Sequence, residues 1–317
     1  MRSLALLAVV LLLFAVLPLL AGGYLIHVVI LILFFAYLSS AWNILGGFAG
    51  QFSFGHAVFL GIGAYTSSIL YVRYGISPWI GMAIGSIFST VVGVCIGYLC
   101  FRYGLKGPFF SLATLAFAEM FRVTALNIDV TNKASGILIP LKHASLAALQ
   151  FENGTGYYYI ILLFNVAVTL LVFYISRSKL GDYFEAIRED EDAAEALGID
   201  TLKYKVLAIA ISAFLTSIGG TFYAQYLSYI DPVICFGSQN SFEIFIRPIL
   251  GGLGAVFGPF LGALILGPLS EISRALLGKY TGMHLMLFGA IVVAVIMFLP
   301  GGVVGFLRKR IKWIYIA

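Results

Sequence analysis

The sequence predicts an all-α polytopic membrane protein with about ten transmembrane helices, and three observations support this fold class. Hydrophobic residues make up 61% of the 317 positions and charged residues only 10%, whereas soluble domains carry about 25% charged residues. Apolar runs of about 20 residues, long enough to cross a bilayer, recur along the chain. The 35 glycines suit packed membrane helices, where small residues let backbones approach closely. We therefore expect one transmembrane domain over residues 1–317.

The predicted spans cover most of the chain. They lie at about 4–20, 24–45, 52–72, 79–101, 107–126, 157–176, 205–229, 242–254, 256–273 and 283–304. The eighth is short and the third and ninth are rich in glycine, so eight or nine helices are also compatible with the pattern. The first span has the composition of a signal peptide, but Leu19 stands where an Ala-x-Ala cleavage site needs a small residue. We expect that helix to be retained.

The placement of Lys and Arg favours ten spans. In that arrangement 12 of these residues lie on the side of the N-terminus and five on the other side, as expected if the first side is cytoplasmic. Nine spans would move the basic tail at 308–312 to the outside. We therefore expect cytoplasmic termini, a cytoplasmic loop at 177–205 and an external loop at 127–156.

Two glycine-rich stretches interrupt hydrophobic segments in different halves of the chain. They are GGFAGQFSFG at 46–55 and GGLGAVFGPF at 251–260. Matching broken helices in two halves predict an internal repeat with a translocation path at its interface. The alternative is that these glycines only permit tight helix packing, as pairs spaced four apart do. The residues we assign to the path are Gly46, Gly50, Ser53, Glu119, Arg247, Gly251 and Gly254.

Two pairs of opposite charges fall within or near predicted spans. Glu119 and Arg122 are three residues apart, and Glu243 and Arg247 are four apart. Charges at membrane depth usually face a cavity or a partner. The pairs would either line a path for a zwitterionic solute or form local ion pairs near helix ends.

The cytoplasmic loop is unusually acidic. The stretch from Asp182 to Asp200 holds 8 of the 14 acidic residues. Asp192 followed by Glu195 predicts a capping box at a helix start, and Gly198 suits the left-handed position that ends a helix. Just before it, Phe184 and Ile187 predict the buried face of another short helix. The loop is either a docking knob or a solvated charged face.

The stretch Asp192 to Gly198, D-A-A-E-A-L-G, resembles the E-A-A-x-x-x-G loop of ABC importer permeases, with Asp in place of the usual Glu. Longer stretches resemble the permeases of branched-chain amino-acid ABC importers of the LivM type, and are spread over most of the chain. These stretches are residues 46–66, 104–122, 178–199 and 251–263. The resemblance implies the type II ABC importer permease fold with an internal repeat.

The resemblance also implies how the acidic loop works. In this family the loop forms a coupling helix that sits in a groove of the ATPase subunit, and Ala193 and Ala194 would keep its exposed face slim. The residues that would carry ATPase coupling are Glu185, Arg188, Glu189, Asp192, Ala193, Ala194, Glu195 and Gly198. The implied partners are two ABC ATPase subunits, a second related permease and an extracytoplasmic solute-binding protein, and the implied location is the bacterial inner membrane.

One departure concerns the external loop. The stretch VTNKASGI at 130–137 lacks the Gly-Gly of the family's T-G-G-x-x-G pattern, which puts contacts with a binding protein there in doubt.

Several other functions are disfavoured by the sequence. No G-x-x-x-x-G-K-[ST] motif occurs, so the chain must rely on separate ATPase subunits and is not itself expected to be an enzyme. The four histidines and three cysteines form no metal-binding pattern, we expect no cofactor, and no basic patch suits nucleic acid. The alternatives that remain are a permease for urea or short amides and, less favoured, an ion-coupled secondary transporter.

Overall fold

We describe a computed structural model of the chain. The structure describes residues 17–18, 22–141, 145–277 and 301–305, together with single positions between 286 and 297. Most of the first and last predicted spans, 4–20 and 283–304, and the basic tail at 308–312 lie outside the described residues.

The described chain is built almost entirely of helices, which confirms the predicted all-α class. The long and medium helices are α2 (Gly23–Asn43), α3 (His56–Tyr74), α4 (Pro78–Arg102), α5 (Pro108–Asn127), α6 (Gly154–Ser176), α7 (Lys179–Glu189), α9 (Thr201–Leu227), α11 (Ser238–Gly251) and α12 (Gly258–Leu277). The shorter elements are the π-helical turn η1 (Ile44–Phe48), the 3-10 turns η2 (Asp129–Thr131), η3 (Lys133–Ser135) and η4 (Leu146–Ala148), the helices α8 (Glu191–Ala196) and α10 (Pro232–Phe236), and the strands β1 (Ile137–Leu138) and β2 (Tyr229–Ile230).

Five of the described helical segments are long and apolar enough to cross a membrane, as expected of a multi-pass protein. They are Gly23–Phe48, Pro78–Arg102, Pro108–Asn127, Gly154–Ser176 and Thr201–Leu227. The eighth predicted span forms α11, which has 14 residues and so rises only about 21 Å. That is less than the roughly 30 Å of a bilayer's hydrocarbon core, so α11 reaches only part of the way across.

Small residues bring the central helices α3, α4 and α9 close together. A Cβ atom at Gly220 of α9 would lie 2.0 Å from the carbonyl oxygen of Leu60, and one at Gly63 would lie 2.1 Å from that of Ser217. A Cβ at Gly93 of α4 would lie 2.8 Å from Ala213. Glycine therefore permits a backbone approach here that no other residue allows, as the composition predicted.

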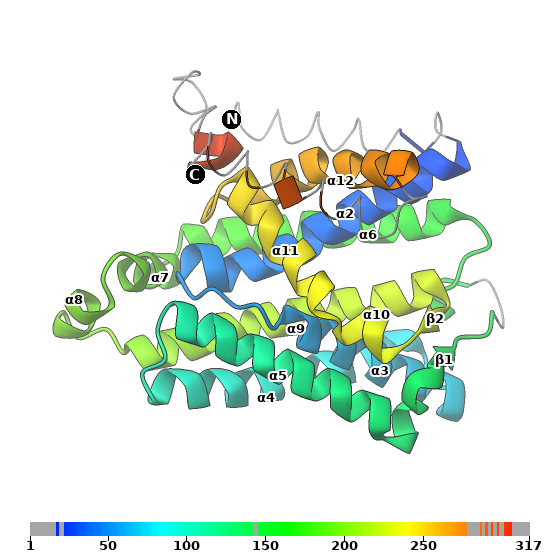
Figure 1. Cartoon of the computed structure of the whole chain (residues 1–317), viewed down its shortest axis with the longest axis horizontal. Helices are drawn as coiled ribbons and strands as arrows, with labels where there is room; N and C mark the ends of the chain where they lie inside the picture. Colours follow the sequence, from blue (N-terminus) through cyan, green and yellow to red (C-terminus); the bar gives the residue numbers. More distant parts are fainter. Residues whose placement is uncertain are drawn as a thin grey trace.

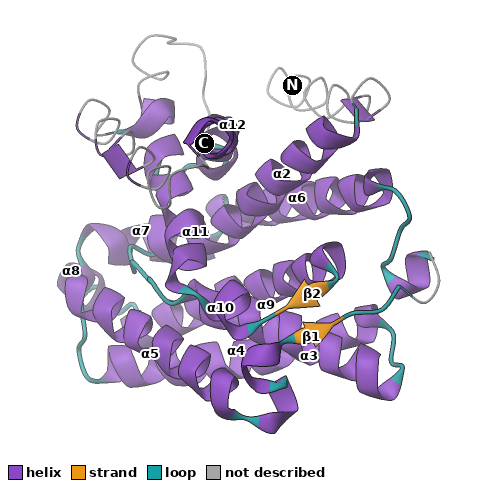
Figure 2. Cartoon of the chain, turned by 45° about the vertical axis from the view of Figure 1, so that its right-hand side comes forward, coloured by secondary structure: helices purple, strands orange, loops and turns teal. Residues whose placement is uncertain are grey.

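The helices run between two ends of the bundle (Figure 1). At one end lie α7 and α8, where Lys106 of the α4–α5 connection bonds to Asp192 at 2.8 Å. At the other end β1 pairs with β2 in antiparallel register (Figure 2), and Arg73 at the end of α3 donates to the carbonyl of Val130 at 2.8 Å. The loops predicted as cytoplasmic and external thus lie at opposite ends.

Candidate functional site

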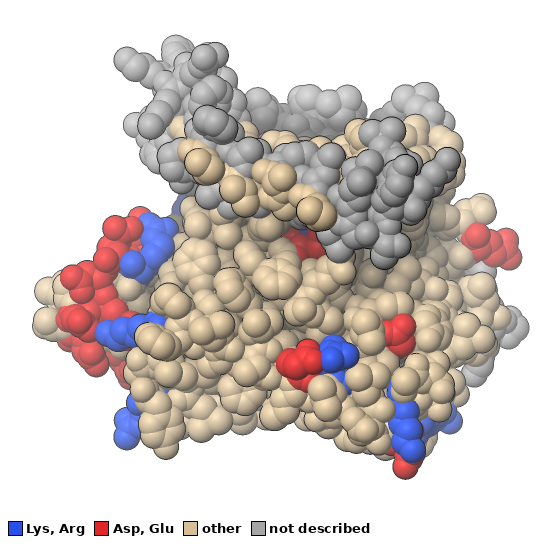
Figure 3. All heavy atoms as spheres, in the orientation of Figure 1, with Lys and Arg blue, Asp and Glu red and all other residues tan. Residues whose placement is uncertain are grey.

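Charged side chains gather at the end formed by α7 and α8, whereas most of the surface between the two ends is uncharged (Figure 3). This distribution matches a molecule whose sides face lipid and whose ends face water. The acidic end is therefore the first candidate site. The second is formed by the two glycine-rich stretches beside it, residues 46–55 and 251–260, which we call the glycine breaks.

Helix α7 lies against the bundle through one apolar face, as predicted. Phe184 is fully buried and Ile187 is 3% exposed. Gly181 lets the helix approach the end of α6, since a Cβ there would lie 2.4 Å from the carbonyl oxygen of Ile175. The amphipathic pattern thus fixes which side of α7 faces water.

Helix α8 begins two residues earlier than the sequence predicted. Its N-cap is Asp190, whose Oδ1 accepts hydrogen bonds from the backbone N–H groups of Asp192 and Ala193, both at 3.0 Å. The predicted cap at Asp192 with Glu195 as its partner is therefore wrong. Either carboxylate could cap a helix, and Asp190 does so because its backbone is extended, with φ −157° and ψ 107°.

The end of α8 agrees with the prediction. Gly198 has φ +88°, and its N–H bonds to the carbonyl of Glu195 at 2.9 Å. The prediction that Ala194 lies on the exposed face of α8 is wrong, because Ala194 is 2% exposed and packs inward. Ala193 and Glu195 remain exposed, and beside them Leu197 is 82% exposed. Leu197, not Ala194, belongs to the outward surface.

Two lysines hold α8 against the bundle. Lys106 bonds to Asp192 at 2.8 Å, and Lys205 of α9 bonds to Glu191 at 2.6 Å. The Lys205 side chain is only 4% exposed and its ammonium lies 4.9 Å from the ring centre of Phe101. The hydrogen bond with Lys106 lowers the pKa of the Asp192 carboxyl and raises the pKa of the lysine. Both groups therefore stay charged over the physiological pH range.

The two glycine breaks contact each other. A Cβ at Gly47 would lie 2.6 Å from the backbone nitrogen of Gly254. Asn43, at the end of α2, joins them: its Oδ1 accepts from the N–H of Gly254 and its Nδ2 donates to the carbonyl of Ala255, both at 3.1 Å. Segments about 200 residues apart in the sequence thus meet where α2 and α11 end.

Arg188 of α7 reaches the same junction. Its Nη1 donates to the carbonyl of Gly47 at 3.2 Å, and its Nη2 donates to Glu185 at 3.2 Å and to Glu189 at 2.8 Å. The structure therefore brings one predicted coupling residue, Arg188, beside two predicted path glycines, because a Cβ at Gly50 would lie 2.8 Å from its Cγ and one at Gly254 would lie 2.6 Å from its Nη1.

The other glycines assigned to the path are tightly packed. A Cβ at Gly46 would lie 2.2 Å from the ring of Trp42, and one at Gly251 would lie 1.8 Å from the carbonyl oxygen of Gly258. Ser53 is 1% exposed, and its carbonyl accepts from Trp42 Nε1 at 2.8 Å. Their role in a path stays a prediction.

Both predicted charge pairs form ion pairs. Arg122 Nε donates to Glu119 at 2.9 Å on a partly exposed face of α5. Arg247 lies 2.7 Å from Glu243 within α11 and is 2% exposed, with its guanidinium carbon 4.1 Å from the ring centre of Phe35. The two pairs lie on different helices, and each forms within a single helix. The assignment of Glu119 and Arg247 to a path stays a prediction.

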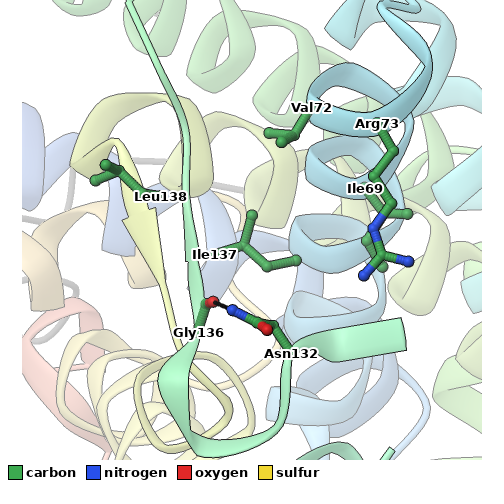
Figure 4. A pocket seen from close by; sticks show the side chains of 7 residues that line it. All are labelled: Ile69, Val72, Arg73, Asn132, Gly136, Ile137 and Leu138. Carbon is green, nitrogen blue, oxygen red and sulfur yellow. Dashed lines mark hydrogen bonds between the residues drawn. The ribbon is translucent and has the colours of Figure 1, made fainter. Parts of the chain in front are cut away.

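The opposite end carries a pocket of about 300 Å³, shown in Figure 4. Its lining residues come from α3 and the external loop: Ile69, Val72, Arg73, Asn132, Gly136, Ile137 and Leu138. Asn132 and Lys133 occupy the positions of the missing Gly-Gly and both have positive φ, 62° and 53°. The loop therefore keeps a backbone conformation that favours glycine, despite the departure in sequence.

Four residues of the site had no clear signal in the sequence: Lys106, Lys205, Asn43 and Leu197. Lys205 could have been suspected, since a lysine at the start of a long apolar helix needs a partner. The contacts of Lys106 and Asn43 join segments far apart in the chain, which no local pattern reveals, and the exposure of Leu197 depends on how α8 packs against the bundle.

Comparisons with known proteins agree on one relationship. A protein family described as "Branched-chain amino acid transport system / permease component" matches residues 24–296. The high-affinity branched-chain amino acid transport system permease protein LivM of Escherichia coli K12 is 29% identical over 293 residues, or 85% of this chain and 67% of that protein. The corresponding permease protein LivH of Salmonella typhimurium is 24% identical over 86% of this chain and 91% of that protein. No solved structure matches this chain significantly.

Proposed function

Because this chain belongs to the family of branched-chain amino acid transport system permease components, we propose that it carries leucine, isoleucine and valine across the bacterial inner membrane in an ATP-driven importer. Relatives at 29% and 24% identity are named permease proteins of high-affinity branched-chain amino acid transport systems. The observation that carries the mechanism is the acidic pair of helices α7 and α8 at one end of an apolar bundle.

In this proposal α8 is the docking element for an ABC ATPase. It is a six-residue helix with its start fixed by Asp190 and its end by Gly198. It presents a narrow surface of Ala193 and Leu197, and an exposed leucine of this kind would bury apolar area in a groove of the ATPase. The chain supplies no hydrolytic site of its own, since it has no P-loop.

We include three further partners in the proposal, supported by the two ends of the molecule and by the relatives. A solute-binding protein would dock at the opposite end, over η2, η3 and the β1–β2 pair. Escherichia coli K12 has both a LivM and a LivH that are similar to this chain, so we expect two related permeases in one assembly. Two ATPases would then meet the two coupling loops.

The test is reconstitution of the complete assembly in proteoliposomes, with labelled solutes supplied through the binding protein. Leucine, isoleucine and valine should accumulate only when ATP is present on the ATPase side, and a proton or sodium ionophore should leave uptake unchanged. Uptake of urea or acetamide in place of these amino acids would assign a different solute. Uptake that needs an ion gradient and no ATP would contradict the proposal.

A further inference from the structure

One arginine joins the coupling helices to both glycine breaks. Arg188 lies in the last turn of α7, two residues before the Asp190 cap of α8. Its guanidinium donates inward to the carbonyl of Gly47 at 3.2 Å. The same guanidinium lies beside Gly254 in the second glycine break, where a Cβ would lie 2.6 Å from Arg188 Nη1.

The Gly47 carbonyl is suited to this bond. The helix from Gly23 to Phe48 ends at η1, and the last carbonyls of a helix have no intrahelical donor. They also carry the negative end of the helix dipole, which a nearby cation stabilises. Arg188 therefore acts as a C-terminal cap supplied from another helix.

Both glycine breaks leave space for the Arg188 side chain, Gly50 for its stem and Gly254 for its guanidinium. Gly50 has φ +70°, and a Cβ there would lie 2.8 Å from Arg188 Cγ; Gly254 has φ +69°. A side chain at either position would have to displace the arginine or the backbone. The absent side chains thus make room for Arg188, which explains these two glycines more specifically than general helix packing does.

Two carboxylates hold the other side of the guanidinium. Glu185 and Glu189 accept from Nη2 at 3.2 and 2.8 Å, and both side chains are mostly exposed. A planar guanidinium can donate to these carboxylates and to a backbone carbonyl at the same time, whereas a lysine ammonium is a single point charge on a flexible stem. The contact therefore requires arginine in particular.

We infer that Arg188 is a positioning residue that makes the coupling helices and the two glycine breaks move together during transport. A displacement of α7–α8 by the ATPase is passed through the guanidinium to the end of η1 and to the start of the connection between α11 and α12. Arg188 faces inward and transmits the movement, while α8 makes the ATPase contact. This inference rests on the proposed function.

The experiment compares Arg188→Gln and Arg188→Lys in the complete reconstituted assembly, with Lys179→Gln as the matched control. Lys179 is an exposed residue at the start of the same helix. Lys179→Gln removes one positive charge, as Arg188→Gln does. Three quantities are measured: co-purification of the ATPase, the rate of ATP hydrolysis, and solute molecules taken up per ATP hydrolysed.

We expect Arg188→Gln to bind the ATPase and hydrolyse ATP normally while uptake per ATP falls at least about tenfold, within the range of measured coupling energies. Arg188→Lys should lie between this variant and wild type, and Lys179→Gln should match wild type. Normal uptake per ATP in Arg188→Gln would overturn the inference. Loss of ATPase co-purification would also overturn it, since Arg188 would then belong to the docking surface.

If Arg188→Gln does not accumulate in the membrane, Arg188→Lys decides the question, because wild-type uptake per ATP in that variant would contradict the need for a guanidinium. Failure of the proposed function is distinguishable, since the wild-type assembly itself would then show no ATP-driven uptake.

Discussion

At the scale of single residues, the start of α8 depends on one carboxylate. Asp190 accepts two backbone hydrogen bonds, so Asp190→Ala should cost about 0.5–2 kcal/mol of local helix stability. Amide exchange across residues 191–198 should then speed up roughly 2- to 30-fold in hydrogen-exchange mass spectrometry. Asp192→Ala removes an exposed ion pair with Lys106 and should change exchange much less. Faster amide exchange in Asp192→Ala than in Asp190→Ala would mean that Asp192 caps α8.

Substitutions at Gly198 test the free-energy cost of its backbone conformation, separately from any side-chain contact. Its φ is +88°, and a Cβ placed there meets nothing within 4 Å. Gly198→Ala should therefore destabilise the end of α8 by about 1–2 kcal/mol through the left-handed conformation alone, and Gly198→Val should destabilise it more because a branched side chain tolerates positive φ poorly. The same exchange measurement checks both variants. Equal exchange in wild type and Gly198→Val would mean that the turn rearranges without strain.

At the scale of elements, α8 has an inner and an outer face with different roles. Leu197 is 82% exposed and Ala194 is 2% exposed. Leu197→Asp should leave membrane accumulation unchanged and reduce ATPase co-purification at least about tenfold, because it removes about 1.5–3 kcal/mol of apolar burial and places a charge in the interface.

The matched substitution on the inner face is Ala194→Leu. It overpacks the contact between α8 and the bundle, which typically costs about 1–3 kcal/mol, and should weaken ATPase binding only indirectly, through faster amide exchange in α8. Normal ATPase binding in Leu197→Asp, together with normal ATP-driven uptake, would place the docking surface elsewhere.

At the scale of the whole molecule, the two ends should lie on opposite sides of the membrane. Leu138 is 70% exposed beside the external pocket and Leu197 is 82% exposed on the acidic loop. In intact cells a membrane-impermeant maleimide should label Leu138→Cys and not Leu197→Cys, and permeabilisation should expose the second. Wild type, which contains Cys95, Cys100 and Cys235, is the control. Labelling of Leu197→Cys in intact cells would mean that the acidic loop lies outside the cell and would contradict the predicted orientation.

Features that depend on local composition and periodicity could be predicted from the amino-acid sequence. Apolar runs predicted the five described segments that are long and apolar enough to cross a membrane, the Phe184 and Ile187 spacing predicted the apolar face of α7, and Gly198 predicted the end of α8. These predictions succeeded because burial in lipid and the left-handed conformation each select residue types directly. The family resemblance came from motifs of the same local kind.

The folded chain was needed to show which of several equivalent residues performs each role. Asp190 and Asp192 are both good caps in sequence, and the backbone angle at Asp190 selects it. The sequence places Arg188 among several charged coupling residues, yet in the structure it caps the helix that ends at Phe48 and fills the space left by Gly50 and Gly254. The role of Arg188 arises from contacts between segments far apart in the chain, and the free energy of such contacts exists only once the helices have packed.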